Sequence, residues 1–236
     1  MKDVSWFLAI CADNGLKLSD EQATSFETYL KLLLLWNSRI NMISRKDEDN
    51  FYSRHVLNCI SFLFNRGLKR DAKILDLGTG GGLPGIPLKI LCPDLNIILL
   101  DSIAKKTAAL SDIVNKMQLE NVEVVNGRAE ELSKLDEFQG KFDYVVTRAA
   151  AKLNEVTRWS RGFLKPSELI GNKMIPVGML IVLKGGTIDD ELRAARNINF
   201  VNSIEVDDIT FKGMNELDNK EKKLILIKYS ALEKKN

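Results

Sequence analysis

The stretch from Lys73 to Leu91, KILDLGTGGGLPGIPLKIL, constrains the fold of this chain more than any other. An apolar run, Ile74 to Leu77, leads into a loop with glycines at positions 78, 80, 81, 82 and 85, and an apolar-periodic segment follows. Glycine tolerates positive φ and has no Cβ, so such a loop can turn sharply and present bare N–H groups to a ligand. The pattern predicts a strand, a ligand-binding turn and a helix.

Two ligand chemistries compete over these glycines. Gly80, Gly82 and Gly85 match GxGxxG, the dinucleotide pattern, whereas Gly78, Gly80 and Gly82 match GxGxG, which is typical of S-adenosylmethionine sites. In the dinucleotide fingerprint the first glycine directly follows the strand. Gly78 holds that place here, which puts Leu83 where the third glycine belongs. The register therefore favours S-adenosylmethionine over NAD(P).

Two carboxylates support this interpretation. Asp76 ends the first strand, where it would attract an ammonium or sulfonium and would repel a pyrophosphate by on the order of 1 kcal/mol. Asp101 follows a second apolar run, Asn96 to Leu100, where an acid can accept hydrogen bonds from both ribose hydroxyls. The alternative for Asp101 is an acid that stabilises a helix N-terminus.

The 236 residues leave room for one α/β domain with an appendage. From residue 69 onward strands and helices alternate, so we expect a mostly parallel, Rossmann-like sheet with an antiparallel closing strand. Strands are expected at 74–77, 96–100, 122–125, 142–147, 179–183, 203–210 and 223–229, with helices at 103–117, 153–164 and 188–197.

Residues 1–68 are expected to form a helical region that packs against the sheet. One helix carries an apolar face that ends at Asn14, and a second begins at a capping box of Ser19 with Gln22. Asp47 can cap a third helix, which Gly67 can close in the left-handed conformation.

Composition narrows the functional classes. There is one histidine and three cysteines without paired spacing, so we expect no metal site and buried, reduced thiols. No apolar run reaches the roughly 18 residues of a membrane span, which predicts a soluble, cytoplasmic protein, and we expect a monomer. A net charge of +2 is too small to attract nucleic acid through its overall field, so RNA binding would need local basic patches.

Ligands of such sheets bind at the carboxyl ends of the strands. Ala129 and Glu130 follow the third strand, where an N–H and an acid could receive adenine, although Glu130 could instead cap a short helix. Arg148 ends the fourth strand, where a guanidinium can hold a carboxylate, a phosphate or guanine, unless it is simply solvated. Lys184 ends the fifth strand at the same edge and is a candidate RNA contact.

Further basic residues are candidate RNA contacts. Lys105 and Lys106 open a helix and could touch phosphates or simply face water. Arg54 and His55 lie in the helical region and are also candidate RNA contacts. A lone histidine there is usually packed in the core, and the alternative is a catalytic role. The charged segment from Asn219 to Lys223 is interpreted as a solvated turn.

Several motifs together resemble the bacterial 16S rRNA (guanine-N7)-methyltransferases of the glucose-inhibited division protein B type. They are ILDLGTGGGLPGIPL at 74–88, LDS at 100–102, RAE at 128–130, TRA at 147–149, WNSRINMI at 36–43 and SRH at 53–55. The resemblance implies a class I S-adenosyl-L-methionine-dependent fold, methylation of one guanine in the decoding region of 16S rRNA, and cofactor contacts at Gly78, Leu83, Ala129, Glu130 and Arg148. An extra segment, Ser167 to Gly178, departs from the family and leaves the edge of the cleft there undefined.

The expected chemistry needs no general base, because guanine N7 carries an in-plane lone pair at neutral pH. The enzyme has only to align the nucleophile with the methyl group, and no catalytic residue is assigned. The rival hypotheses are a NAD(P)-dependent oxidoreductase, a non-catalytic RNA-binding module on the same fold, and a methyltransferase for small molecules.

Overall fold

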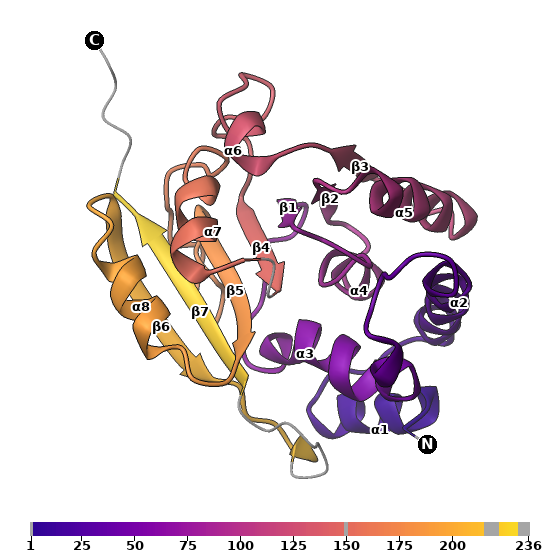
Figure 1. The fold of residues 1–236 in the computed structure, drawn as a ribbon. Helices are drawn as coiled ribbons and strands as arrows, with labels where there is room; N and C mark the ends of the chain where they lie inside the picture. Colours follow the sequence, from indigo (N-terminus) through magenta and orange to yellow (C-terminus); the bar gives the residue numbers. More distant parts are fainter. Residues whose placement is uncertain (1, 149–150, 215–221, 231–236) are drawn as a thin grey trace.

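The computed structural model describes residues 2–148, 151–214 and 222–230, and its centre is a seven-stranded sheet in the order β3-β2-β1-β4-β5-β7-β6 (Figure 1). Strands β1 to β5 run parallel, and β7 is antiparallel to both of its neighbours. The predicted mostly parallel sheet with an antiparallel closing strand is therefore confirmed. The strands are β1 Lys73–Leu77, β2 Asn96–Asp101, β3 Val122–Asn126, β4 Tyr144–Arg148, β5 Met179–Gly185, β6 Val201–Asp208 and β7 Lys222–Tyr229.

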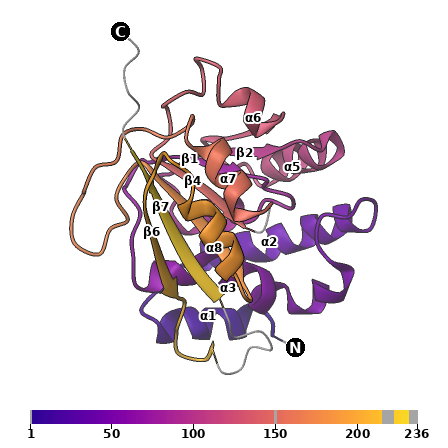
Figure 2. The ribbon, with the colours of Figure 1, turned by 60° about the vertical axis from the view of Figure 1, so that its left-hand side comes forward.

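Helices cover both faces of the sheet. One face packs against α4 (Gly85–Leu91), α5 (Ala104–Lys116) and the N-terminal helices, and the other against α6 (Ala129–Leu132), α7 (Leu153–Ser160) and α8 (Asp189–Arg196). Figure 2 shows α7 and α8 side by side over the second face.

Side chains alternate between the two faces of the sheet, so each strand contributes residues to the hydrophobic cores on both faces. In β4, Tyr144 and Val146 belong to the core beneath the N-terminal helices, and Val145 belongs to the other. The same period of two directs Arg148 toward the N-terminal helices. It directs Asp76 of β1, which follows Ile74 by two residues, to the same face.

The N-terminal helices pack on the sheet as predicted. They comprise α1 (Val4–Asp13) and α2 (Asp20–Asn37), and α2 opens with the capping box of Ser19 and Gln22. Phe26 and Leu33 of these helices are fully buried in one core with Ile74 of β1. This core contains residues from both sides of residue 68. The division into a helical region and a sheet domain at that residue therefore stays a prediction.

The segment predicted as a third helix departs from a regular α-helix. It consists of a 3₁₀ helix (Arg45–Asn50), a π-helix (Phe51–Val56), α3 (Leu57–Ile60) and a 3₁₀ helix (Ser61–Phe64). Asp47 does not cap it but accepts from Arg54 Nη1 at 2.5 Å. Most of the π-helix is buried, so this segment has no single apolar face of the kind a regular surface helix shows. Gly67 also lacks the predicted positive φ.

Two further expectations are corrected near β4. Helix α7 ends at Ser160 and not at residue 164, because the backbone of Phe163 and Lys165 instead bonds to Phe142. The extra segment 167–178 bonds to Gly67 and Asp143, at the amino ends of the strands. It therefore lies away from the edge where ligands are expected.

The cysteines are free thiols. Cys11 and Cys59 are buried as predicted, and burial raises the pKa of each to about 12, whereas Cys92 is only partly buried. Among the described residues, no helix is long and apolar enough to cross a membrane.

Tyr29 of α2 ties the N-terminal helices to the glycine loop, because its hydroxyl donates to the Gly81 carbonyl at 2.7 Å in a fully buried position. Tyr29→Phe leaves that carbonyl unpaired, so we expect a loss of about 1–3 kcal/mol in the free energy of unfolding, measured by urea denaturation. Tyr52 is the matched control, because its buried hydroxyl has no hydrogen-bond partner among the described residues. An equal loss in Tyr52→Phe would contradict the assignment.

Candidate functional site

The loop after β1 adopts the register predicted for S-adenosylmethionine. Gly78, Gly80 and Gly82 have φ values of 71°, 56° and 92°, which other residues adopt at a cost. Gly85 is required for a different reason: a Cβ there would lie 2.3 Å from Leu99 Cδ2, so its absence lets α4 approach the sheet. The three glycines of the GxGxG pattern are thus the positions at which the loop requires a positive φ.

The Asp76 side chain at the end of β1 accepts hydrogen bonds from this loop. It is fully buried, and its Oδ2 accepts from Thr79 Oγ1 at 2.6 Å and from the Gly85 N–H at 2.8 Å, while Oδ1 has no partner. Burial raises the pKa of this carboxyl to about 7, against the opposing effect of the two hydrogen bonds. Asp76 does not line the cavity described next, so its carboxylate shapes the loop.

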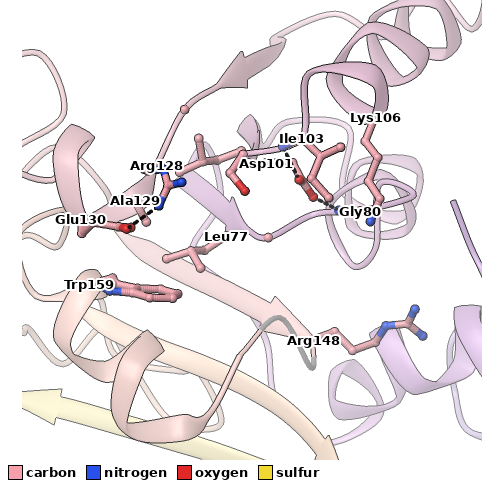
Figure 3. A pocket seen from close by; sticks show the side chains of 14 residues that line it. Leu77, Gly80, Asp101, Ile103, Lys106, Arg128, Ala129, Glu130, Arg148 and Trp159 are labelled. Carbon is pink, nitrogen blue, oxygen red and sulfur yellow. Dashed lines mark hydrogen bonds and ion pairs between the residues drawn. The ribbon is translucent and has the colours of Figure 1, made fainter. Parts of the chain in front are cut away.

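A cavity of about 500 Å³ opens at the carboxyl ends of β1, β2 and β3 (Figure 3). Six of the seven predicted cofactor residues line it; the exception is Leu83, which is 3% exposed and packs in the core instead. The six are Gly78, Gly80, Asp101, Ala129, Glu130 and Arg148. Residues that are far apart in the sequence therefore lie together at the carboxyl ends of the strands, where the alternation of strands and helices predicted a ligand.

Asp101 braces one wall of this cavity. Its Oδ2 accepts from the Gly80 N–H and its Oδ1 from the Ile103 N–H, each at 2.9 Å (Figure 3). A carboxylate has about four acceptor positions, so both oxygens can accept further hydrogen bonds. The arrangement suits a ligand with two neighbouring hydroxyls, such as a ribose.

The opposite wall combines apolar and polar groups. Ala129 is buried, whereas the side chain of Glu130 is 44% exposed and lies 3.7 Å from Arg128 Nη1. Trp159 of α7 also lines this wall, on the side of Glu130, and sequence reasoning missed it (Figure 3). Its spacing of three from the buried Val156 is the signal that could have placed it on the face of α7 that packs on the sheet.

Arg148 extends from β4 away from Trp159 and toward the N-terminal helices (Figure 3). Its Nη1 lies 3.1 Å from His55 Nδ1. A guanidinium can only donate, so Nδ1 accepts and the proton of the neutral ring lies on Nε2. Burial and the charge of Arg148 lower the pKa of His55 to about 4, which keeps the imidazole neutral at physiological pH.

A second cavity, of about 350 Å³, shares Arg148 with the first. Its other lining residues are Arg54, His55, Asn58, Leu183, Lys184, Gly185, Ile209, Lys222 and Lys223, none of them a carboxylate. Three predicted RNA contacts, Arg54, His55 and Lys184, thus come together here. Lys106 instead lines the first cavity, and Lys105 is exposed on α5 outside both.

The segment interpreted as a solvated turn needs correction in part. Residues 219–221 lie outside the described residues, but Lys222 and Lys223 begin β7 and line the second cavity. Local sequence could not reveal this, because a strand that starts with two lysines resembles a charged loop.

The buried Asp76 carboxyl predicts a pH-dependent difference between the wild type and Asp76→Asn. An acid whose pKa is raised in the folded state lowers stability progressively as pH rises from its unfolded value, 3.8, to about 7. Asparagine does not ionise and can still accept from Gly85, so the free energy of unfolding should shift in favour of Asp76→Asn by on the order of 2 kcal/mol between about pH 5 and pH 8. A difference that does not change with pH in urea denaturation would refute this.

Comparison with known proteins places the chain in a family. The model of the rRNA small subunit methyltransferase G family matches residues 22–223. Relatives named ribosomal RNA small subunit methyltransferase G include one from Clostridium novyi, 33% identical over 87% of this chain and 84% of the relative. Another, from Porphyromonas gingivalis, is 40% identical over 76% of this chain and 77% of the relative.

Solved structures agree on the fold. A predicted O-methyltransferase from Agrobacterium tumefaciens has a TM-score of 0.55 at 13% identity, covering 75% of this chain and 81% of that one. A tRNA (m1A58) methyltransferase from Aquifex aeolicus has a TM-score of 0.53 at 16% identity, covering 86% and 76%. These similarities show a class I methyltransferase fold, and the family match and the relatives together show that the chain belongs to the rRNA small subunit methyltransferase G family.

Proposed function

We propose that the protein transfers the methyl group of S-adenosylmethionine to N7 of one guanine in the decoding region of 16S rRNA, acting as a cytoplasmic monomer on the small ribosomal subunit. Its family and fold make it an S-adenosylmethionine-dependent rRNA methyltransferase. One observation carries the finer proposal: Arg148 forms a common wall between the cavity at the glycine loop and a second, cationic cavity.

The first cavity suits the cofactor. Asp101 offers free acceptor positions for the ribose, and Ala129 with Glu130 offers a backbone N–H and an acceptor for adenine. When bound, S-adenosylmethionine supplies a methyl group on a sulfonium. All the relatives and structures compared above are methyltransferases, which leaves the NAD(P) alternative without support.

The second cavity suits a guanine that reacts through an existing lone pair. No carboxylate among the described residues lines it, and the low pKa of His55 together with its occupied Nδ1 makes the imidazole a poor base. Attack by N7 requires no proton removal. The protein then contributes chiefly by alignment, which can supply roughly 7–11 kcal/mol for well-oriented reactants.

The target base must leave its stack, at a cost of a few kcal/mol. Arg54 and His55 place the N-terminal helices at the cavity that would receive the base. We therefore assign these helices to the grip on folded RNA that offsets unstacking, with Lys105 and Lys106 as phosphate contacts on the cofactor side.

The first test is transfer of labelled methyl from S-adenosylmethionine to small ribosomal subunits that lack their 7-methylguanine. Label should appear in 16S rRNA as 7-methylguanine, and Arg148→Ala should lower kcat/KM by about 10- to 100-fold, since it removes charge-assisted hydrogen bonds. Arg70→Ala is the matched control, because Arg70 is 88% exposed at the opposite edge of the sheet. Cofactor binding without transfer would favour a non-catalytic module, and label only in small metabolites would favour the small-molecule alternative.

A second test concerns the shape of the substrate. With a net charge of +2, the protein should need a structured RNA to gather enough contacts. Turnover on a short, unstructured oligonucleotide that contains the target guanine should be at least about 100-fold slower than on the subunit. Equal turnover would remove the role assigned to the N-terminal helices.

A further inference from the structure

We propose that the second cavity binds a backbone phosphate of the RNA next to the target guanine, held by Arg148 and Lys222, with His55 as the positioning residue for Arg148. The inference rests on the proposed function, because the phosphate belongs to the strand that is methylated. It assigns the anion to residues on three elements, the π-helix, β4 and β7.

Sheet register brings the two cations together. Arg148 of β4 pairs with Leu183 of β5, which pairs with Leu224 of β7. Lys222 precedes Leu224 by two residues and so points to the same face as Arg148. Because neighbouring strands lie about 4.8 Å apart, the two backbones are separated by roughly 10 Å across the sheet, which two long side chains can span around one ligand.

The antiparallel direction of β7 is what makes this possible. A strand parallel to β5 would bring its carboxyl end to this edge, but β7 brings its first residue, Lys222, opposite Gly185. Lys222 therefore lies at the edge that carries the glycine loop, although it is 137 positions beyond Gly85 in the chain. The cavity thus gains Lys222 in addition to Arg148 of β4 and Lys184 of β5.

Among the described residues, these two cations have no carboxylate partner. Lys184 pairs with Glu191 and Arg54 with Asp47, but within the described ranges no ion pair with a carboxylate involves Arg148 or Lys222. The pKa of Lys222 is lowered by burial and then by the charges of Arg148 and Arg54. Like charges held together in a half-buried cavity are unfavourable unless an anion binds between them.

Within this cavity, which is proposed to receive the target guanine, the charge of Arg148 and Lys222 fits the neighbouring phosphate better than the purine itself. Methylation at N7 leaves the purine positively charged, and unscreened cations beside it would oppose the transfer. A phosphate offers several acceptor oxygens to the guanidinium fork and the ammonium, and its charge cancels theirs. The phosphate then anchors the strand while the base reaches toward the methyl group.

His55 supplies both a support and a probe. Its Nδ1 accepts from Arg148 Nη1, so the neutral ring holds the guanidinium without adding charge. Besides Arg148, the charges that act on this imidazole come from Asp47, Arg54 and Lys222. It is the only histidine of the chain, so its ¹⁵N resonances are assigned without ambiguity.

The experiment follows the imidazole ¹⁵N shifts of His55 at pH 7 while the full-length protein is titrated with inorganic phosphate, guanosine or guanosine 5′-monophosphate. Inorganic phosphate and the nucleotide should each give a saturable shift at His55. The nucleotide should bind at least about tenfold more tightly than guanosine, as expected for charge-assisted hydrogen bonds.

Three variants complete the test. Lys222→Gln should abolish most of the preference for the nucleotide over guanosine, and Lys222→Arg should restore it. Lys141→Gln, an exposed lysine before the amino end of β4, should leave the preference unchanged. S-adenosylmethionine affinity, measured in parallel, should be the same in all three, and in methyl transfer Lys222→Gln should raise KM for the subunit more than it lowers kcat.

The outcomes separate this inference from the proposed function. Equal affinities for guanosine and its 5′-monophosphate, or no response of His55 to phosphate, would overturn the phosphate site even if 7-methylguanine forms. A phosphate response that depends on Lys222, together with no methyl transfer, would retain the site and refute the function. If Lys222→Gln fails to bind the cofactor, the phosphate site is tested by the wild-type titrations and by Lys222→Arg, which should keep the preference for the nucleotide over guanosine.

Discussion

The buried carboxylate of Asp76 is the interaction on which the site depends. Its Oδ2 joins Thr79 at the beginning of the glycine loop to Gly85 at its end, so both sides of the turn are held to β1. This geometry leaves the N–H of Gly80 free to bond Asp101, which connects the loop to β2. The first cavity is the space that these bonds keep open.

The N-terminal helices act on the same loop from the outside. Tyr29 donates to the carbonyl of Gly81, and His55 accepts from Arg148. Trp36 also donates to Asp112 of α5 at 2.8 Å, which fixes α2 beside the helix that borders the first cavity. The helical region is therefore part of the site, because it shares the core of the sheet and supplies one wall of the second cavity.

The two cavities differ in charge, and Arg148 stands between them. The first contains Asp101 and Glu130 among its lining residues, which suits a cofactor that carries positive charge. The second is lined, in the part of the chain that the structure describes, by several cations and no carboxylate, which suits an anionic strand. Under the proposed function, the cofactor occupies the first cavity and the RNA strand the second, with Arg148 between them. A chain with a net charge of +2 would then contact RNA through a local group of cations.

Sequence reasoning succeeded where the physical signal is local. The capping box at Ser19 and the glycines at 78, 80 and 82 depend on neighbouring residues only, and all adopt the predicted geometry. It failed for the third helix, where the largely buried π-helix Phe51–Val56 shows no single apolar face. The cofactor contact expected at Leu83 stays a prediction, because this side chain packs in the core. Trp159 was missed because its role depends on which helix face meets the sheet.

By itself, the sequence determined a strand, a glycine turn and a helix, followed by alternating elements whose carboxyl ends carry Asp101, Glu130 and Arg148. It could do so because positive φ and periods of two or 3.6 are properties of short segments. Only the tertiary structure decided that Arg148 meets His55 and that Lys222 reaches the same cavity. The first contact follows from the packing of the N-terminal helices on the sheet, and the second from the insertion of β7 between β5 and β6. Both are long-range arrangements that no local pattern encodes.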